Sequence, residues 1–368
     1  MKRDLITITY SNIDKTDGPV IHYLELWNSF SRRFKDEFNV KGLACVTRSQ
    51  RPFLIDNGFP IETISSNFPR PIRLILQDLF FAIKILRHRK SVIYIRTGPN
   101  MFLSIVFSRL LRVFLITEHN GIASLDAMSN KRGGLFSGFV AYMERLSIRT
   151  STGCIGVSNG ITDHLMRSGA KAAVCIRNGV SAEFFEVKPS GGDAAVRIVY
   201  VGTFTPWDGA AHIVELARKF PAVEFYLVGE GRHKAEVEAS AEGLGNVFFK
   251  NFVEYRNLRA EYSKYDAGIV LYETERNTME LSSLKTLEYL ACGLPIFSTR
   301  VPGQEFIEEN QIGVLCRLDE VEAAFSEFLG DLPRYRKSVD DYRSTQGQQF
   351  SWDRTSRETR DFINSCYT

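Results

Sequence analysis

The sequence lacks most features that would assign the protein to a specialised class. Its six cysteines stand far apart, without the short spacings of a metal site, so reduced thiols in a cytoplasmic protein are expected. A net charge of +3 is too small to indicate nucleic acid as a partner. No solenoid-length repeat and no low-complexity tract occurs. The remaining composition, 44% hydrophobic and 24% charged residues, is that of an ordinary globular protein.

Long hydrophobic runs are also missing. The apolar run near the N-terminus is too short for a signal peptide and predicts a strand instead. Residues 101–116 are strongly apolar, but Arg109 and Arg112 interrupt this segment and it is short for a membrane span. We therefore expect no transmembrane helix, and 368 residues predict two domains of ordinary size.

Two successive halves of the sequence carry the same alternation of short apolar runs and amphipathic segments. This alternation predicts an α/β fold with parallel sheets covered by helices. Predicted strands lie at 5–10, 40–46, 92–95, 113–117, 154–158, 174–177, 196–201, 224–228, 247–249 and 268–271. A polar, glycine-rich linker is predicted at 188–194. The expected domains therefore cover 1–187 and 195–349, followed by a terminal helix over 350–368.

Parallel sheets bind ligands at the carboxyl ends of their strands, and several polar stretches fall there. Gly18 follows the first predicted strand and is a candidate wall of the site, although a turn needs glycine in any case. His119 lies in a Glu-His-Asn-Gly sequence that follows another strand, where it is either catalytic or structural. In the second half, Gly202 and Thr203 follow one strand and Arg232 another.

Residues 280–295 form the most informative stretch, because they predict a helix with both ends marked. Ser282 or Ser283 can cap its start, and Gly293 with Pro295 ends it. If the helix starts at the serines, Glu280 precedes it and Glu288 lies inside it. Both carboxylates then border one pocket at the helix N-terminus.

Lys285 falls in the first turn of this helix, where the macrodipole disfavours a cation. A diphosphate bound to the free N–H groups of the turn would explain that placement. An amphipathic helix with solvated charges is the alternative interpretation.

Several motifs together resemble retaining GT-B glycosyltransferases, specifically glycosyltransferase family 4 and its branch acting in cell-surface polysaccharide assembly. The second half carries the resemblance most strongly, over 197–316. It depends on the sequences at 202–209, 228–231, 265–269 and 289–295, and on the glutamates at 280 and 288. The first half carries further landmarks in the right order at 118–121, 157–158 and 178–180.

The resemblance implies two Rossmann-like domains facing across a cleft, with the terminal helix crossing back onto the first. It implies a nucleotide diphosphate sugar as donor, a saccharide or lipid-linked saccharide as acceptor, retention of anomeric configuration, and no metal or other cofactor. The expected activity is that of a hexosyltransferase in surface polysaccharide biosynthesis.

The resemblance also implies roles for individual residues. Glu280 would bind the donor's sugar hydroxyls and Glu288 its ribose, and Lys285 would hold the diphosphate together with backbone N–H groups. His119 would lie near the sugar and the departing phosphate. The expected donor-binding residues are Gly18, Gly202, Thr203, Arg232, Ser282, Ser283, Leu284 and Glu288.

The sequence departs from the family at the turn after the first strand of the second half. Many members carry an arginine and a lysine there, where this chain has Thr203 and Asp208. Asp208 has the wrong sign beside a phosphate. A catalytically silent relative that binds nucleotide-sugar or a partner glycosyltransferase is therefore the second hypothesis. An epimerase or phosphorylase is a third, although a phosphorylase would bring a longer chain and a cofactor lysine.

The segment 68–90 combines broad apolar content with basic residues at both ends. One interpretation is peripheral contact with an anionic membrane at the cytoplasmic face, which would suit a lipid-linked acceptor. The other is a helix packed on the sheet with its lysines and arginines reaching to solvent, which we prefer slightly.

Overall fold

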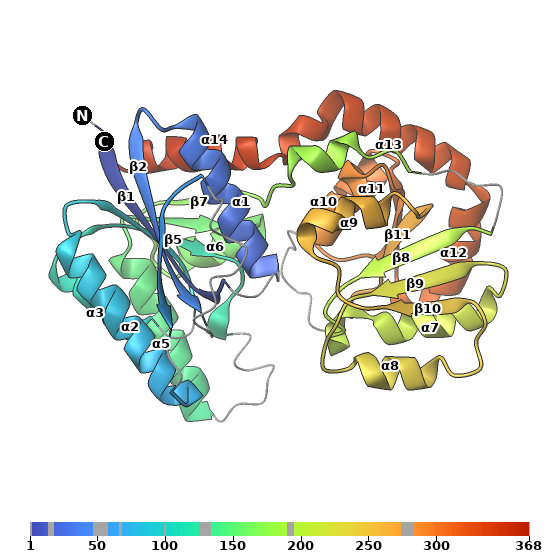
Figure 1. The fold of residues 1–368 in the computed structure, drawn as a ribbon, viewed down its shortest axis with the longest axis horizontal. Coiled ribbons are helices and arrows are strands. Elements are labelled where there is room, and N and C mark those ends of the chain that lie inside the picture. The colour runs from blue at the N-terminus through green and yellow to red at the C-terminus, as the bar shows by residue number, and fades with distance from the viewer. Residues whose placement is uncertain are drawn as a thin grey trace. The chain divides into compact units, whose positions relative to one another are not determined.

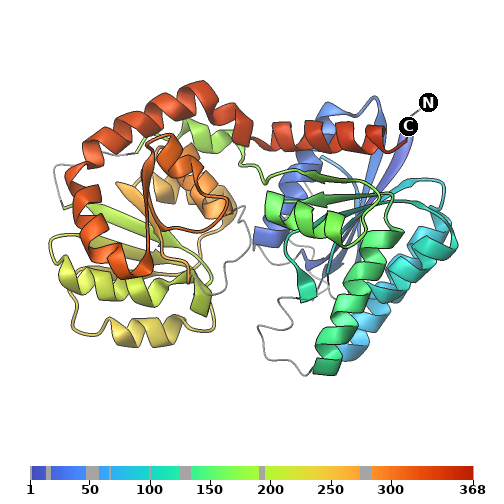
Figure 2. The same cartoon turned by 180° about the vertical axis from the view of Figure 1, so that it is seen from behind.

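The computed structural model describes residues 2–13, 18–46, 58–65, 68–98, 101–124, 134–189, 195–273 and 283–367. The chain divides into two compact units, one formed by residues 1–178 with 352–368 and the other by 179–351 (Figures 1 and 2). Each unit is built on a parallel sheet covered by helices, so the predicted α/β class is confirmed.

The first unit contains a seven-stranded sheet in the order β3-β2-β1-β4-β5-β6-β7, with every neighbouring pair parallel. Its strands are β1 (Arg3–Asn12), β2 (Phe38–Val46), β3 (Ile61–Ser65), β4 (Val92–Arg96), β5 (Phe114–His119), β6 (Gly153–Gly156) and β7 (Ala173–Cys175). β5 continues two residues beyond the predicted end, so His119 is its last residue instead of lying in the following loop.

Successive side chains of each strand point to opposite faces of this sheet, and helices cover both faces. The helices are α1 (Gly18–Arg33), α2 (Arg70–Arg87), α3 (Phe102–Leu110), α5 (Gly134–Thr150), α6 (Asn159–Arg167) and α14 (Trp352–Ser365). In β1, Ile6 and Ile8 pack in the core beneath α2 and α3, whereas Thr7 contacts Tyr23 of α1. α14 packs on α1, where Ser29 Oγ donates to Asp353 at 2.6 Å.

The second unit contains a six-stranded parallel sheet in the order β10-β9-β8-β11-β12-β13. Its strands are β8 (Arg197–Val201), β9 (Glu224–Val228), β10 (Val247–Lys250), β11 (Ala267–Val270), β12 (Ile296–Thr299) and β13 (Gly313–Cys316). Its helices are α7 (Ala210–Lys219), α8 (Lys234–Ser240), α9 (Tyr255–Tyr262), α10 (Leu284–Ala291), α11 (Phe306–Glu309), α12 (Val321–Gly330) and α13 (Leu332–Gln346).

The boundary between the units falls earlier than the expected linker at 188–194. Val180 pairs with Ser351, and Phe184 is buried in a core cluster with Tyr262 and Leu290. Residues 179–189 therefore pack as part of the second unit. The later part of the expected linker, 190–194, lies outside the described residues.

Among the described residues, no helix is long and apolar enough to cross a membrane. The apolar segment that begins at Met101 instead forms α3 and leads into strand β5. Ile105 of α3 and Leu115 of β5 are fully buried in the core of the first unit.

Candidate functional site

The predicted helix at the centre of the second half is α10, which runs from Leu284 to Ala291. Ser283 is its N-cap residue, but the Ser283 side chain does not cap the helix. Its hydroxyl instead shares a 2.7 Å hydrogen bond with Tyr272. Gly293 follows the helix with a φ of +80°, the left-handed conformation that ends many helices. Glu280 and Ser282, two of the predicted site residues, lie outside the described residues.

Lys285, in the first turn of α10, is held in a cage of aromatic rings and one carboxylate. Its ammonium lies 2.8 Å from Asp208 Oδ1. It also lies 5.0 Å from the ring centre of Tyr200 and 5.5 Å from that of Tyr272, which are cation–π distances. Burial alone would lower the pKa of Lys285, but Tyr200 and Asp208 outweigh it and raise that pKa above its usual range. The lysine is therefore a fixed positive charge at a helix N-terminus.

Asp208 has the wrong sign to lie beside a phosphate. In the structure it forms an ion pair with the ammonium of Lys285. Burial raises the pKa of Asp208, but the charge and hydrogen bond of Lys285 outweigh burial and lower it overall. Its second oxygen accepts long hydrogen bonds from Thr203 Oγ1 and the Thr205 amide, each at 3.4 Å. Thr203 is therefore connected to Lys285 through Asp208.

Glycines allow the turns after β8, β9 and β11 to lie against each other beside Lys285. Gly209 has a φ of +68°, and a Cβ there would overlap the carbonyl of Leu271. Gly229 has a φ of +137°, and its Cβ would overlap the carbonyl of Gly202. Gly202 and Gly229 thus have a packing role at this edge of the sheet.

Glu288 lies one turn further along α10 and is buried. Tyr262 donates a 2.8 Å hydrogen bond to its Oε2. Burial raises the pKa of Glu288 to about 7, against the smaller opposing effects of Tyr262 and Lys285. The carboxyl group therefore changes charge near neutral pH, and it can accept a ligand hydroxyl best once it is ionised.

In the first unit, Glu118 lies at the centre of a buried polar cluster at the end of β5. His22 Nε2 lies 3.0 Å and Arg96 Nε 3.4 Å from Glu118 Oε1, and the Tyr94 hydroxyl donates to Oε2 at 2.6 Å. Burial would raise the pKa of Glu118, but His22 and Arg96 outweigh it and hold that pKa at about 2. Glu118 is thus a permanent anion that fixes the end of β4, α1 and the loop containing Asn120.

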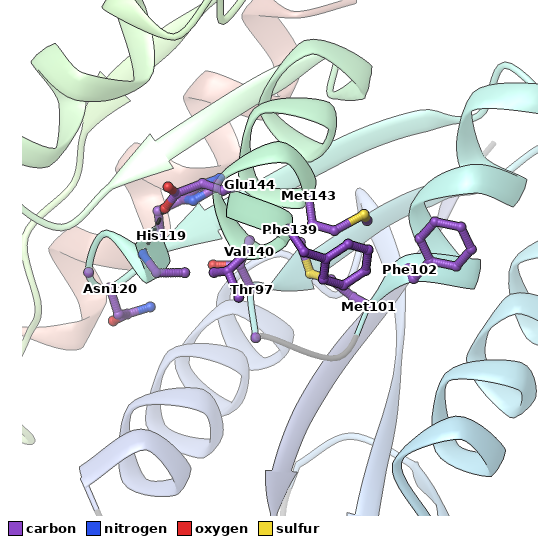
Figure 3. Close-up of a pocket in the computed structure, with 12 residues that line it drawn as sticks. Thr97, Met101, Phe102, His119, Asn120, Phe139, Val140, Met143 and Glu144 are labelled. Atoms are coloured by element: carbon purple, nitrogen blue, oxygen red, sulfur yellow. Dashed lines mark hydrogen bonds between the residues drawn. The ribbon is translucent and has the colours of Figure 1, made fainter. Parts of the chain in front are cut away.

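His119 follows Glu118 and is also buried, with Nε2 3.1 Å from Thr117 Oγ1. Burial lowers the pKa of His119 to about 4, so the imidazole is neutral at neutral pH. His119 lines a cavity of about 260 Å³ together with Thr97, Asn120 and Gly121 (Figure 3). The role expected for His119 near the sugar and the departing phosphate stays a prediction, and a neutral ring cannot supply a charge to a phosphate.

The remaining predicted residues are distributed as follows. Ser283 and Leu284 stand at the start of α10 beside Lys285. Arg232 lies exposed in the turn after β9. Gly18 is the first residue of α1 in the other unit. The sequence analysis missed Tyr200, Tyr262 and Tyr272. Tyr200 and Tyr272 stand near the carboxyl ends of predicted strands, whereas Tyr262 ends α9 (Tyr255–Tyr262), which was not predicted.

Comparisons with known proteins show which family and which folds this chain resembles. Residues 195–332 match the family model of the glycosyl transferases group 1. No curated protein matches the sequence. Among solved structures, HepE of Anabaena in complex with UDP and glucose superposes with a TM-score of 0.76 at 14% identity, covering 99% of this chain and 100% of that chain.

Two further structures have the same architecture over their full lengths. The sucrose-phosphate synthase of Thermosynechococcus elongatus has a TM-score of 0.78 at 16% identity, with 100% of this chain and 99% of that chain covered. A TarM mutant of S. aureus, in complex with Fondaparinux, alpha-GlcNAc-glycerol and UDP, has a TM-score of 0.72 at 10% identity, with 98% and 100% covered. The protein therefore has the GT-B glycosyltransferase fold, and its second unit carries the group 1 glycosyl transferase sequence pattern.

Proposed function

We propose that the protein is a glycosyltransferase that moves a sugar from a nucleotide diphosphate sugar to a saccharide or lipid-linked saccharide in surface polysaccharide assembly. The observation that carries this proposal is the ammonium of Lys285 in the first turn of α10, inside the region that matches the family. A lysine and free backbone N–H groups at one helix N-terminus form a site for an anion such as a diphosphate. HepE, of the same fold, was solved with UDP and glucose.

The proposed reaction forms a bond between the acceptor hydroxyl oxygen and C1 of the donor sugar. The bond between C1 and the diphosphate oxygen breaks, and the diphosphate leaves with the electron pair. The hydroxyl proton passes to the departing diphosphate. Lys285 and the α10 amides stabilise the charge that develops on this leaving group, which is the main electrostatic task of the step.

We further propose that the transfer retains the anomeric configuration and needs no metal ion, because Lys285 and α10 supply the positive charge. In this proposal, Glu288 binds the ribose and Glu280 the donor sugar, while His119 contacts the acceptor in the first unit as a neutral hydrogen-bonding group. Gly202, Thr203, Ser283 and Leu284 border the diphosphate.

The ion pair between Lys285 and Asp208 favours one alternative, a catalytically silent relative that binds nucleotide-sugar or a partner glycosyltransferase. Asp208 neutralises the one cation that α10 presents among the described residues. If the pair does not open, a diphosphate gains less from Lys285. The two hypotheses differ in turnover, because only the first produces free nucleoside diphosphate.

A thermal-shift screen against UDP, GDP, ADP, CMP and their common sugar conjugates tests the proposal. A ligand that binds only the folded protein raises its melting temperature by mass action. We expect one nucleotide class to raise it in the wild type and to have little effect on Lys285→Met. Exposed Lys219 provides a matched control as Lys219→Met. No shift from any nucleotide would contradict the proposal.

We also propose peripheral binding of α2 to an anionic membrane. Ile72, Ile75, Leu79, Ile83 and Leu86 form an exposed apolar stripe along this helix. Arg87, Arg89 and Lys90 are exposed at its C-terminal end, whereas Lys84 is paired with Glu62. An apolar face beside basic side chains suits the boundary between acyl chains and acidic headgroups. α2 also packs on the sheet through Phe81 and Ile85, and the apolar stripe lies on its exposed side.

A further inference from the structure

The cavity beside His119 lies wholly within the first unit and is built from two kinds of element (Figure 3). Thr97, Gly98 and His119 come from the carboxyl ends of β4 and β5. Phe102 comes from α3, and Phe139 with Met143 from α5. The space thus extends from the edge of the sheet into the gap between two helices.

The two ends of this cavity differ in polarity. Figure 3 shows His119, Asn120 and Glu144 together at one end. The other end is lined by Met101, Phe102, Phe139 and Met143. A ligand that fills the whole cavity must therefore be polar on one side and apolar on the other.

The polar end is suited to hydroxyl groups. Glu144 already accepts hydrogen bonds from the Ala123 amide at 2.7 Å and from Ser124 Oγ at 2.6 Å. His119 is neutral at neutral pH, because burial lowers its pKa. No lysine or arginine lines the cavity in the described part of the chain. A sugar hydroxyl fits this end better than a phosphate group, which would need a cation.

The apolar end reaches the molecular surface. Phe102 is 45% exposed and Phe139 is 52% exposed, so both line the cavity and also form its outer rim. Tyr142, one turn along from Phe139, is exposed as well. A hydrocarbon chain longer than the cavity can therefore leave past these exposed aromatic side chains.

The size of the cavity limits the distance between the two parts of the ligand. Pockets for small molecules usually measure about 300–1,000 Å³, and this one measures about 260 Å³. It holds one small unit, not an oligosaccharide. A hydroxyl at His119 and an apolar group at Met143 must therefore belong to neighbouring parts of one molecule.

We propose that the acceptor is a lipid-linked saccharide whose hydrocarbon chain is joined close to the accepting sugar, and that this chain occupies the α3–α5 end of the cavity. The inference rests on the proposed function and narrows its acceptor class. A reaction that attaches the preceding sugar to a hydrocarbon carrier must supply this substrate. The transfer is therefore an early step on a lipid carrier and not the extension of a long free chain.

Methyl NMR of protein labelled with ¹³C-methyl methionine tests binding directly. The chain has six methionines, of which Met101 and Met143 line the cavity, while Met166 is exposed on α6 and serves as an internal reference. The probe is octyl β-glucoside below its micelle concentration. Glucose and 1-octanol, its polar and apolar parts, are titrated separately. We expect octyl glucoside to shift the Met101 and Met143 signals at lower concentration than glucose or 1-octanol does, with the Met166 signal unchanged.

Two substitutions on α3 form a matched pair for this titration. Phe102→Asp places a charge at the rim of the cavity, whereas Leu110→Asp places the same charge on a residue of the same helix that does not line it. Both side chains are exposed, so both variants are expected to fold. We expect Phe102→Asp to weaken octyl glucoside binding by roughly tenfold or more, since a charged group at the apolar entrance of the cavity is costly to desolvate. Leu110→Asp should leave octyl glucoside binding unchanged.

Other results would overturn the inference. Unchanged Met101 and Met143 signals would show that no alkyl glycoside enters the cavity, and equal weakening by both variants would indicate adsorption to the apolar surface. Binding of glucose as tight as that of octyl glucoside would exclude a need for the chain. Each of these leaves nucleotide binding at Lys285 untouched, so the thermal-shift screen separates failure of this inference from failure of the proposed function.

Discussion

At the scale of single residues, the charge on Lys285 is balanced inside the protein. Asp208 and the rings of Tyr200 and Tyr272 surround its ammonium, and the lysine and aspartate are 77 positions apart in the sequence. A diphosphate that docks at the start of α10 must share this ammonium with Asp208 or displace the carboxylate. Asp208 therefore opposes the ligand that Lys285 attracts.

The first prediction concerns this competition. Asp208→Asn removes the charge but keeps a group of similar shape, so nucleoside diphosphate should bind about tenfold more tightly, equivalent to about 1.4 kcal/mol. The ligand-free variant should unfold more easily, because Lys285 loses its counter-ion. Isothermal titration and urea unfolding measure the two effects. Asp319→Asn, which breaks the exposed pair with Arg317, is the control and should change neither. Weaker nucleotide binding in Asp208→Asn would contradict this account.

The second prediction concerns the pH dependence of Glu288. Its pKa is about 7 in the folded protein against an ordinary value of 4.5, so the folded state holds the proton more tightly. Its contribution to stability is therefore fully present below about pH 4.5 and is lost as the pH rises to about 7, by about 3 kcal/mol. In Glu288→Gln this part of the decline should disappear.

Urea unfolding of the ligand-free protein at several pH values checks that expectation, with the exposed Glu242→Gln as control. Nucleotide affinity should change in the opposite direction. It should rise as the pH passes 7, because the ionised carboxylate accepts ribose hydroxyls better. Equal pH profiles for the wild type and Glu288→Gln would show that Glu288 does not titrate in this range.

At the scale of elements, the site depends on where strands and helices end. Lys285 lies in the first turn of α10 because this helix starts at Leu284. The turns after β8 and β9 lie against each other because Gly229 lacks a side chain that would overlap the carbonyl of Gly202. In the other unit, β5 ends at His119, so the imidazole lies at the cavity because of where the strand ends.

The third prediction concerns α2. The triple variant Arg87→Gln, Arg89→Gln, Lys90→Gln should bind vesicles of mixed neutral and acidic lipid roughly a hundredfold more weakly, since each basic residue near an anionic surface contributes about 1 kcal/mol. Vesicle sedimentation measures this. A control with the same charge change is Lys35→Gln, Arg167→Gln, Lys171→Gln, at exposed positions away from α2.

The apolar stripe has its own variant, Ile75→Ser with Leu79→Ser, which removes two exposed side chains while leaving the charges. It should weaken binding to the same vesicles and leave nucleotide binding unchanged. If both α2 variants bind vesicles like the wild type, this helix only packs on the sheet and does not bind the membrane.

The elements themselves were predictable where the signal is local. Alternating apolar runs predicted β1, β4 and β9, and helix signals at Ser283 and Gly293 predicted α10. Strands β12 and β13 were not predicted, although they are as long as β10 and β11, which were. The ion pair of Lys285 with Asp208 and the hydrogen bond of Tyr262 with Glu288 join distant segments, so no local pattern contains them.

At the scale of the whole molecule, two parallel-sheet units carry different halves of the proposed chemistry. The second unit matches the group 1 glycosyl transferases and presents Lys285, Glu288 and the glycine turns. The first unit presents His119 and an amphipathic cavity. The family resemblance predicted that the second half binds the donor and the first half the acceptor. The polarity of the cavity arises from α3 and α5 and is visible only in three dimensions.

The most direct test of the central claim is ³¹P NMR of the protein with the nucleotide sugar that the thermal screen identifies. The spectrum is followed with and without an alkyl glycoside acceptor. We predict that nucleoside diphosphate accumulates when the acceptor is present, continues to do so in EDTA, and falls at least about a hundredfold in rate in Lys285→Met. A donor that binds but stays intact with every alkyl glycoside and every free saccharide tried would contradict the account and identify a silent nucleotide-sugar binder.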